Sequence, residues 1–121
     1  EYLIIRKTIT VIGENKETTI INDVNGTKSI VYIVETRGVK ITGFTIQNAK
    51  YHYSGIFIHK CNGNIITNNI IKNNFKSIKI NYGHSNHIEF NKLSNNTIGL
   101  EITESNRNSI NTKKTTRIFT F

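Results

Sequence analysis

The sequence predicts an all-β protein with the fold of a parallel β-helix, a solenoid in which short strands stack coil upon coil. Aliphatic residues and asparagines recur at an interval of about 22 residues in the second half of the chain. Within each repeat, aliphatic and polar residues alternate over short stretches that are separated by Asn, Gly and Ser. Alternation is typical of strands, and Asn and Gly are typical of tight turns. We therefore expect about four to five coils of roughly 22 to 25 residues each.

The first half of the chain carries the same pattern with a longer interval. We expect residues 1–37 to form the opening coils and residues 38–111 to form the regular repeats. The longer interval comes from three additional residues, Tyr51, His52 and Tyr53, which a turn would absorb. The aliphatic pairs related by a step of 25 residues are Val31 with Ile56, Ile33 with Ile58, Ile41 with Ile66, and Ile46 with Ile71.

The regular repeats keep a step of 22 residues. The aliphatic residues in register are Ile66, Ile88 and Ile110, then Ile71 with Leu93, Ile78 with Leu100, and Ile80 with Ile102. The asparagines in register are Asn64, Asn86 and Asn108, then Asn69 with Asn91, and Asn73 with Asn95. A fixed period in the twenties with apolar residues in register indicates a solenoid.

Each repeat contains one stretch in which a single residue separates two aliphatic residues. Successive side chains of a strand point to opposite sides, so the aliphatic residues should face inward and the middle residue outward. One buried ladder should comprise Ile58, Ile80 and Ile102, and the next Ile56, Ile78 and Leu100. Replacing Ile80 by Ala should then cost about 2–5 kcal/mol as a core truncation. The corners should carry Asn, which tolerates a left-handed backbone. A leucine-rich repeat would need Leu in an LxxLxL spacing, which the chain lacks.

Resemblance to a known family is clearest over residues 86–102. They read Asn86-x-Ile88-x-x-Asn91-x-Leu93-x-Asn95-Asn96-x-x-Gly99-Leu100-x-Ile102, which resembles the repeat of NosD-type proteins in the pectin-lyase-like superfamily. Residues 9–15 and 38–48 resemble the opening coils of that family. The resemblance spans roughly residues 2–111 and implies a right-handed parallel β-helix in an extracellular, cell-surface or periplasmic protein. It leaves the function open, because lyases, hydrolases, surface adhesins and copper-delivery accessory proteins share this scaffold.

The pattern ends after Ile110. Residues 112–121 lose the asparagines and place Thr115 where an aliphatic ladder residue is expected. We interpret them as a degenerate C-terminal tail, or as a cap in which Phe119 and Phe121 cover the last coil. Open strand edges at the ends of a solenoid also favour end-to-end or edge-mediated self-association. The chain as a whole, residues 1–121, is expected to be one domain. It starts at Glu1 and contains no Met, which fits a processed protein or a piece of a longer one.

The composition limits the partners that we expect. The formal net charge of +8 would suit a nucleic acid or an anionic surface. However, the basic residues are dispersed and form no known nucleic-acid motif, so we expect no specific nucleic-acid partner. No apolar run approaches the length of a membrane span. The chain has one cysteine, Cys61, and therefore no internal disulfide.

The acidic residues give little support to catalysis. Glycoside hydrolysis normally needs two carboxylates across the scissile bond, and Asp23 is the single Asp of the chain. A lyase site would need grouped acidic calcium ligands near a base. Glu101 and Glu104 share one coil with Glu89 a strand away, but Lys79 lies opposite Glu101 and favours a cross-strand ion pair. We therefore favour a non-catalytic chain and name no catalytic residue. A remnant of a polysaccharide lyase or hydrolase is the third alternative.

The resemblance to NosD raises copper as a ligand. The soft donors that could contribute are His59, Cys61, His84 and His87. Cys61 and His84 should lie on adjacent coils near the same corner. No CxxC or HxH spacing supports a metal site, and Cys61 also suits a small buried apolar position. The sequence therefore predicts no bound cofactor, with copper as the one alternative.

A carbohydrate-binding surface is the stronger binding hypothesis. The outward residues of adjacent coils form a ladder of Tyr32, Phe57, Lys79 and Glu101. Aromatic rings can receive the C–H face of a sugar, and neighbouring polar groups can bind its hydroxyls. Tyr51 and Tyr53, in the inserted turn, would form one wall of this surface. In this hypothesis Phe57→Ala abolishes binding of a polysaccharide or cell-surface glycan. The alternative is that the aromatic pair only stabilises the sheet.

Two functions of different classes thus remain. The first is a structural or adhesive surface module with weak carbohydrate affinity. The second is a NosD-like accessory protein that handles copper.

Overall fold

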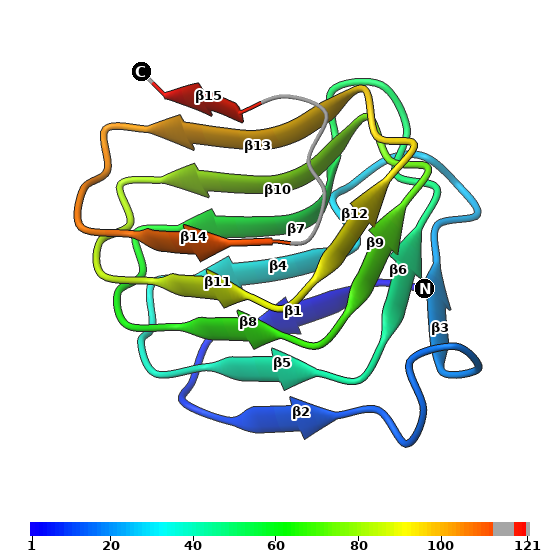
Figure 1. The fold of residues 1–121 in the computed structure, drawn as a ribbon, viewed down its shortest axis with the longest axis horizontal. Coiled ribbons are helices and arrows are strands. Elements are labelled where there is room, and N and C mark those ends of the chain that lie inside the picture. The colour runs from blue at the N-terminus through cyan, green and yellow to red at the C-terminus, as the bar shows by residue number, and fades with distance from the viewer. Residues whose placement is uncertain (113–117, 121) are drawn as a thin grey trace.

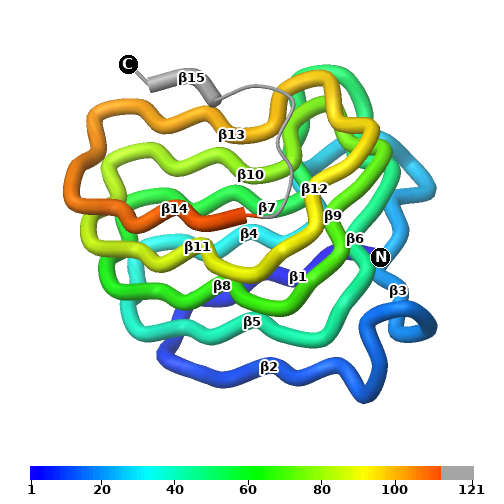
Figure 2. Tube along the Cα trace, in the orientation of Figure 1, coloured from blue at the N-terminus to red at the C-terminus, as the bar shows by residue number. Residues whose placement is uncertain are grey.

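The computed structural model shows a right-handed parallel β-solenoid of about 4 turns (Figure 1). It describes residues 1–112 with their side chains and residues 118–120 as backbone. The tube in Figure 2 shows each coil lying directly on the one before it, from the blue N-terminal coil at the bottom to the orange coil near the top. Each of the first four coils contributes one strand to each of the three sheets described below. This arrangement confirms the fold that the repeat predicts.

Three parallel sheets form the sides of the solenoid. Sheet A contains, in spatial order, β1 (Leu3–Ile5), β4 (Val31–Val34), β7 (Ser54–His59), β10 (Lys76–Asn81), β13 (Ile98–Thr103) and β15 (Ile118–Thr120). Sheet B contains β2 (Thr10–Ile12), β5 (Lys40–Thr42), β8 (Ile65–Thr67), β11 (His87–Glu89) and β14 (Ser109–Asn111). Sheet C contains β3 (Ile20–Asn22), β6 (Thr45–Gln47), β9 (Ile70–Lys72) and β12 (Lys92–Ser94).

The strand register places the aliphatic residues in continuous buried ladders. In sheet A, Ile58 pairs with Ile80, and Ile80 with Ile102. Ile80 is fully buried, and the neighbouring ladder of Ile56, Ile78 and Leu100 is buried with it. The corresponding ladder of sheet B runs through Val11, Ile41, Ile66, Ile88 and Ile110, and that of sheet C through Ile21, Ile46, Ile71 and Leu93. The core is therefore the set of ladders that the sequence predicts.

Buried asparagines form a second kind of ladder at the corners. Asn86 Oδ1 accepts hydrogen bonds from the backbone N–H and the side-chain Nδ2 of Asn64, at 3.0 and 2.8 Å. Asn86 Nδ2 in turn donates to the carbonyl of Cys61 and to Asn108 Oδ1. The same arrangement links Asn69 to Asn91 and Asn74 to Asn96. These side chains satisfy backbone groups that the turns leave unpaired, so they hold each coil to the next.

A separate set of positions adopts the left-handed backbone at the corners. Asn73 and Asn95 belong to it and are exposed, so the third buried ladder consists of the residues that follow them, Asn74 and Asn96. The four rows of left-handed residues are Glu35, Lys60, Tyr82 and Glu104; Gly38, Gly63, Ser85 and Arg107; Gly43, Asn68 and Phe90; and Asn48, Asn73 and Asn95. The expected left-handed corners are thus present, although several are filled by residues other than Asn and Gly.

The inserted residues lie in a turn, as the change of interval predicts. Tyr51 and His52 form the turn between β6 and β7, and the backbone N–H of Tyr53 donates to the carbonyl of Lys50. In sheet A, β7 and β10 are each six residues long. The turn projects beside the N-terminal end of β7, where it borders the outward face of sheet A.

The two ends of the solenoid differ. Among the described strands, β1, β2 and β3 each pair with a neighbour on one side. At the other end the backbone of β15 pairs with β13. The predicted covering of the last coil by Phe119 and Phe121 concerns side chains outside the described residues. In the described part of the chain, no helix has the length and apolar character that a membrane crossing requires.

Candidate ligand groove on sheet A

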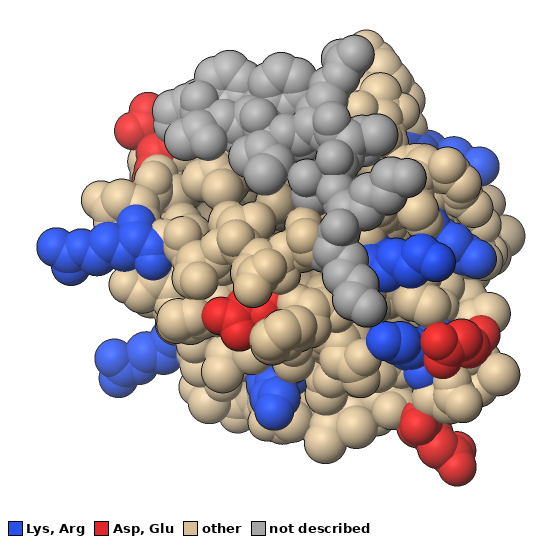
Figure 3. All heavy atoms as spheres, in the orientation of Figure 1, with Lys and Arg blue, Asp and Glu red and all other residues tan. Residues whose placement is uncertain are grey.

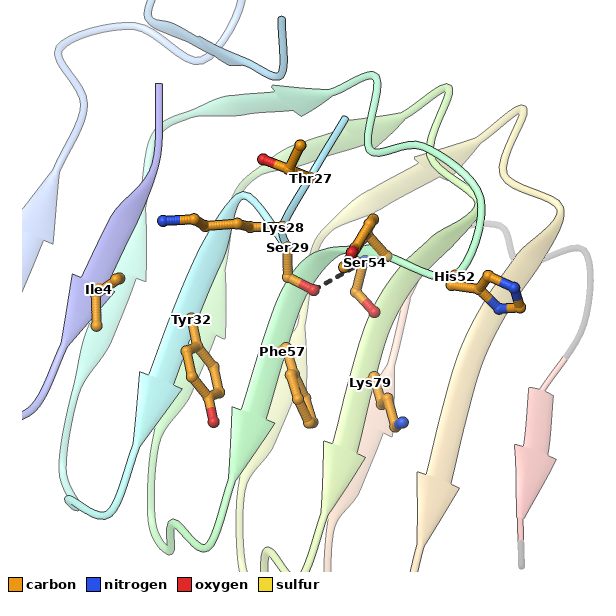
Figure 4. A pocket seen from close by; sticks show the side chains of 10 residues that line it. Ile4, Thr27, Lys28, Ser29, Tyr32, His52, Ser54, Phe57 and Lys79 are labelled. Carbon is orange, nitrogen blue, oxygen red and sulfur yellow. Dashed lines mark hydrogen bonds between the residues drawn. The ribbon is translucent and has the colours of Figure 1, made fainter. Parts of the chain in front are cut away.

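A groove on the outward face of sheet A is the candidate functional site. It has a volume of about 440 Å³. Figure 4 shows its floor, formed by side chains from β1, β4, β7 and β10, and the loop residues that border it. The residues that line it are Ile4, Thr27, Lys28, Ser29, Tyr32, His52, Tyr53, Ser54, Phe57 and Lys79.

The floor of the groove follows from the strand register. Outward residues of adjacent strands are neighbours, so Ile4, Tyr32, Phe57 and Lys79 form one row across sheet A. The rings of Tyr32 and Phe57 stack on each other, with centroids 5.1 Å apart and an interplanar angle of 18°. The Lys79 ammonium lies over the Phe57 ring, 5.1 Å from its centroid. Phe57 therefore has one ring face against Tyr32 and the other against a cation.

This stacking leaves one ring face available for a ligand. The second face of Tyr32 is directed along the row toward Ile4, whose side chain is short and 51% exposed. The rings thus stand against each other instead of lying flat on the sheet as a two-ring platform. Tyr32 is the residue that can receive the C–H face of a sugar, while Phe57 supports it from behind.

The walls of the groove supply polar groups. Ser29 Oγ accepts a hydrogen bond of 3.0 Å from the backbone N–H of Ser54, which holds the two loops together (Figure 4). Thr27 Oγ1 lies 3.1 Å from the Tyr2 hydroxyl, which also donates to Asp23 Oδ1. These hydroxyl groups and backbone contacts fix the wall next to Tyr32 and present hydroxyls of the type that sugars bind.

Charged side chains at the far end of the row form a small network. Glu101 Oε2 lies 2.9 Å from Lys76 Nζ and 3.6 Å from Lys79 Nζ. The predicted cross-strand pair of Glu101 and Lys79 is thus present, and Lys76 is the closer partner. The Glu101 carboxylate is therefore held by two ammonium groups, as an ion-pair partner of Lys76 and Lys79.

The structure brings together part of the predicted carbohydrate surface. Tyr32, Tyr53, Phe57 and Lys79 line the groove, whereas Tyr51 and Glu101 do not. Tyr51 packs on His52 and Phe75, with ring centroids 3.9 and 4.6 Å away. The lining residues that the sequence reasoning missed are Ile4, Thr27, Lys28, Ser29, His52 and Ser54. The register signal that places Tyr32 beside Phe57 could have found Ile4, which is the preceding member of the same row.

Cys61 lies inside the solenoid. Its side chain is fully buried, and its Sγ lies 3.4 Å from the backbone N–H of Thr36 and 3.0 Å from the carbonyl of His59. Burial raises the pKa of the Cys61 thiol. The thiol is therefore held in its protonated form, whereas metal coordination requires the thiolate.

The three histidines proposed as metal ligands each contact a different group. His84 Nδ1 accepts a hydrogen bond of 3.0 Å from the backbone N–H of Asn106. His87 Nδ1, on sheet B, lies 3.7 Å from Glu89 Oε1. His59 is on the outward side of sheet A, where its ring lies 5.5 Å from that of Phe57. Within residues 1–112, no three His, Cys, Asp or Glu side chains are grouped as a metal site.

The Asp23 carboxylate accepts hydrogen bonds within a turn. It is buried, and its Oδ1 accepts hydrogen bonds from the backbone N–H groups of Asn25 and Gly26, at 3.1 and 2.9 Å. These contacts are typical of an Asx turn, so they assign Asp23 to the loop that leads into the groove wall.

Comparison with known proteins gives one match. A family model described as "Periplasmic copper-binding protein (NosD)" matches residues 2–117. Neither a curated protein nor a solved structure matches the chain significantly. The matched segment includes all the strands that form the groove.

Proposed function

Because the chain belongs to the NosD family of periplasmic copper-binding proteins, we propose that it works outside the cytoplasm as a non-catalytic β-helix module. In this proposal the solenoid is a rigid scaffold, and the groove on sheet A binds an oligosaccharide. One observation carries the proposal: the Tyr32 ring has a free face inside a groove that hydroxyl groups border. A sugar ring placed over Ile4 and against the Tyr32 ring would contact an aliphatic side chain and an aromatic face.

The proposed affinity is modest. The groove is open, so a bound sugar buries little of its surface. We expect a dissociation constant of about 10 μM to 1 mM for a short oligosaccharide. An adhesive or structural module can work with such values, because repeated contacts along a polymer add avidity.

Copper is the ligand that the family description names, so the donors of this chain need a fit test. A Cu(I) site would take two or three soft ligands, such as thiolate and imidazole groups, that converge on one point. The Cys61 thiol faces the core, and His59, His84 and His87 do not converge with it. The chain contains no Met that could replace them. The donors in the described residues therefore do not fit a shared copper site, and the proposed function does not depend on the metal.

A chemical-shift titration tests the proposed function. The isotopically labelled chain is titrated with a panel of soluble oligosaccharides, and backbone and aromatic resonances are followed. We expect shifts at Ile4, Tyr32 and Ser29 with at least one oligosaccharide. Tyr32→Ala should weaken binding by about tenfold or more, since it removes the ring on which the sugar is proposed to pack.

Two variants provide the controls. Phe57→Ala should weaken binding less than Tyr32→Ala, because both faces of the Phe57 ring are already covered. Tyr82→Ala removes another exposed aromatic ring outside the groove and should leave binding unchanged. Absence of binding across the panel would contradict the proposal, as would binding that survives Tyr32→Ala.

A further inference from the structure

The charged side chains that line the groove are of one sign. They are Lys28 and Lys79, and no lining residue is Asp or Glu. A neutral sugar needs only hydroxyl partners and an apolar face. A groove that adds two ammonium groups and excludes carboxylates from its lining is electrostatically complementary to an anion.

The charge of Lys79 is only partly neutralised. Its Nζ lies 3.6 Å from Glu101 Oε2, but the same oxygen lies 2.9 Å from Lys76 Nζ. Two ammonium groups thus share one carboxylate, which leaves an excess positive charge at this end of the row. The Lys79 side chain is 27% exposed, so its ammonium is accessible from the groove.

Lys28 provides the second cation, beside Tyr32. Its Nζ is held 5.3 Å from the centroid of the Tyr2 ring. In Figure 4 Lys28 lies next to Tyr32, and Lys79 lies beyond Phe57 on the opposite side of the aromatic pair. The two cations therefore flank the stacked rings, and the free face of Tyr32 is on the side of Ile4 and Lys28.

We infer that the groove selects acidic oligosaccharides, with sugar units that carry carboxylate or sulfate groups. This inference rests on the proposed function and adds the class of ligand to it. A sugar ring packs on Tyr32, and its anionic groups lie toward Lys28 and Lys79. Figure 3 shows Lys and Arg side chains spread over another face of the solenoid, where Asp and Glu side chains accompany them.

A matched pair of ligands tests this inference. Cellotetraose and the tetramer of β-1,4-linked glucuronate have the same backbone and differ at C6, where the second carries a carboxylate. We expect the glucuronate tetramer to bind about tenfold more tightly at low salt, and we expect this preference to shrink as salt is raised. A cellotetraose sulfated at C6 shows whether sulfate can replace carboxylate.

The lysine variants assign the preference to the groove. Lys28→Gln and Lys79→Gln should each reduce the preference for the glucuronate tetramer, and the double variant should abolish it. The readout is the ratio of the affinities for the two tetramers in each variant, because loss of an ammonium group removes an ion contact that only the charged tetramer makes. Lys92→Gln, on β12 of sheet C, is the matched control and should change neither affinity.

The outcomes separate the two proposals. Equal affinity for both tetramers, or a preference that survives the double variant, overturns the acidic selectivity and leaves the proposed function standing. Binding of neither tetramer overturns both. Tighter binding of a four-nucleotide single-stranded DNA than of the glucuronate tetramer would also overturn the inference, since the groove would then recognise a nucleic acid.

Discussion

Phe90 occupies a left-handed backbone position that the preceding coils fill with better-suited residues. Its φ is +56°, and the equivalent residues are Gly43 and Asn68. A left-handed conformation costs an ordinary L-residue roughly 1–2 kcal/mol, and Gly and Asn less. The Phe90 side chain is 63% exposed, so burial of its ring does little to offset this cost.

Replacement of Phe90 should therefore stabilise the protein. We expect Phe90→Asn and Phe90→Gly to raise the free energy of unfolding by about 0.5–1 kcal/mol, measured by urea denaturation. Phe90→Ala removes the same ring but keeps the strain of a β-carbon, and so it should give no gain. Equal stability of all three variants would mean that the backbone position carries no strain.

The role of Cys61 follows from its position in the coil and could not be read from its residue type. In the coil register it takes the place of Thr36, Gly83 and Ser105, which are all small residues. Its Sγ lies near the backbone N–H of Thr36, and Ser105 Oγ accepts from the backbone N–H of Gly83 in the same way. The thiol is thus one more group that links adjacent coils. Cys61 was proposed as a metal ligand because a thiol is a soft donor. Its burial follows instead from its place among the small residues of this row.

At the scale of the coil, the buried asparagines hold each turn in register. Asn86 contacts the coil below through Asn64 and the coil above through Asn108. We expect Asn86→Ala to lower the free energy of unfolding by about 2–4 kcal/mol, since each buried polar group left without a partner costs about 1–3 kcal/mol. Urea denaturation measures this change. Asn106→Ala, at an exposed position of the same corner region, should change it by less than about 0.5 kcal/mol, and a comparable loss there would contradict the special role of the ladder.

The coil architecture could be predicted because its energetics repeat. The aliphatic ladders around Ile58, Ile80 and Ile102 recur at fixed spacing, and burial of an aliphatic side chain demands the same register in every coil. The distinction between exposed Asn73 and buried Asn74 could not be made from spacing, because adjacent asparagines share one period. It depends on which residue adopts the left-handed backbone.

The groove was less predictable than the coils. Tyr32, Phe57 and Lys79 could be placed in one row because strand register fixes outward neighbours. The orientation of the rings depends on side-chain packing, which register does not determine. Residues 27–29 and 52–53 lie in connections that do not repeat, so no period indicates that they border the row.

At the scale of the whole molecule, the solenoid presents a flat sheet on which one irregular region stands out. The regular coils offer repeating surface, while the inserted turn and the long connection before β4 border the groove on sheet A. The family to which the chain belongs fixes the scaffold, and the chemistry of this groove carries the proposed activity. End-to-end association stays a prediction, and β1, β2 and β3, which each pair on one side, are the strand edges through which it would occur.

The most direct test of the central claim is the contact between a bound sugar and the Tyr32 ring. Intermolecular nuclear Overhauser effects should be measured on the complex with the glucuronate tetramer. We predict effects between the C–H protons of one sugar ring and both the Tyr32 ring protons and the Ile4 methyl groups. Effects that instead place the sugar on Tyr51, Tyr82 or Phe90, with none at Tyr32, would contradict the account.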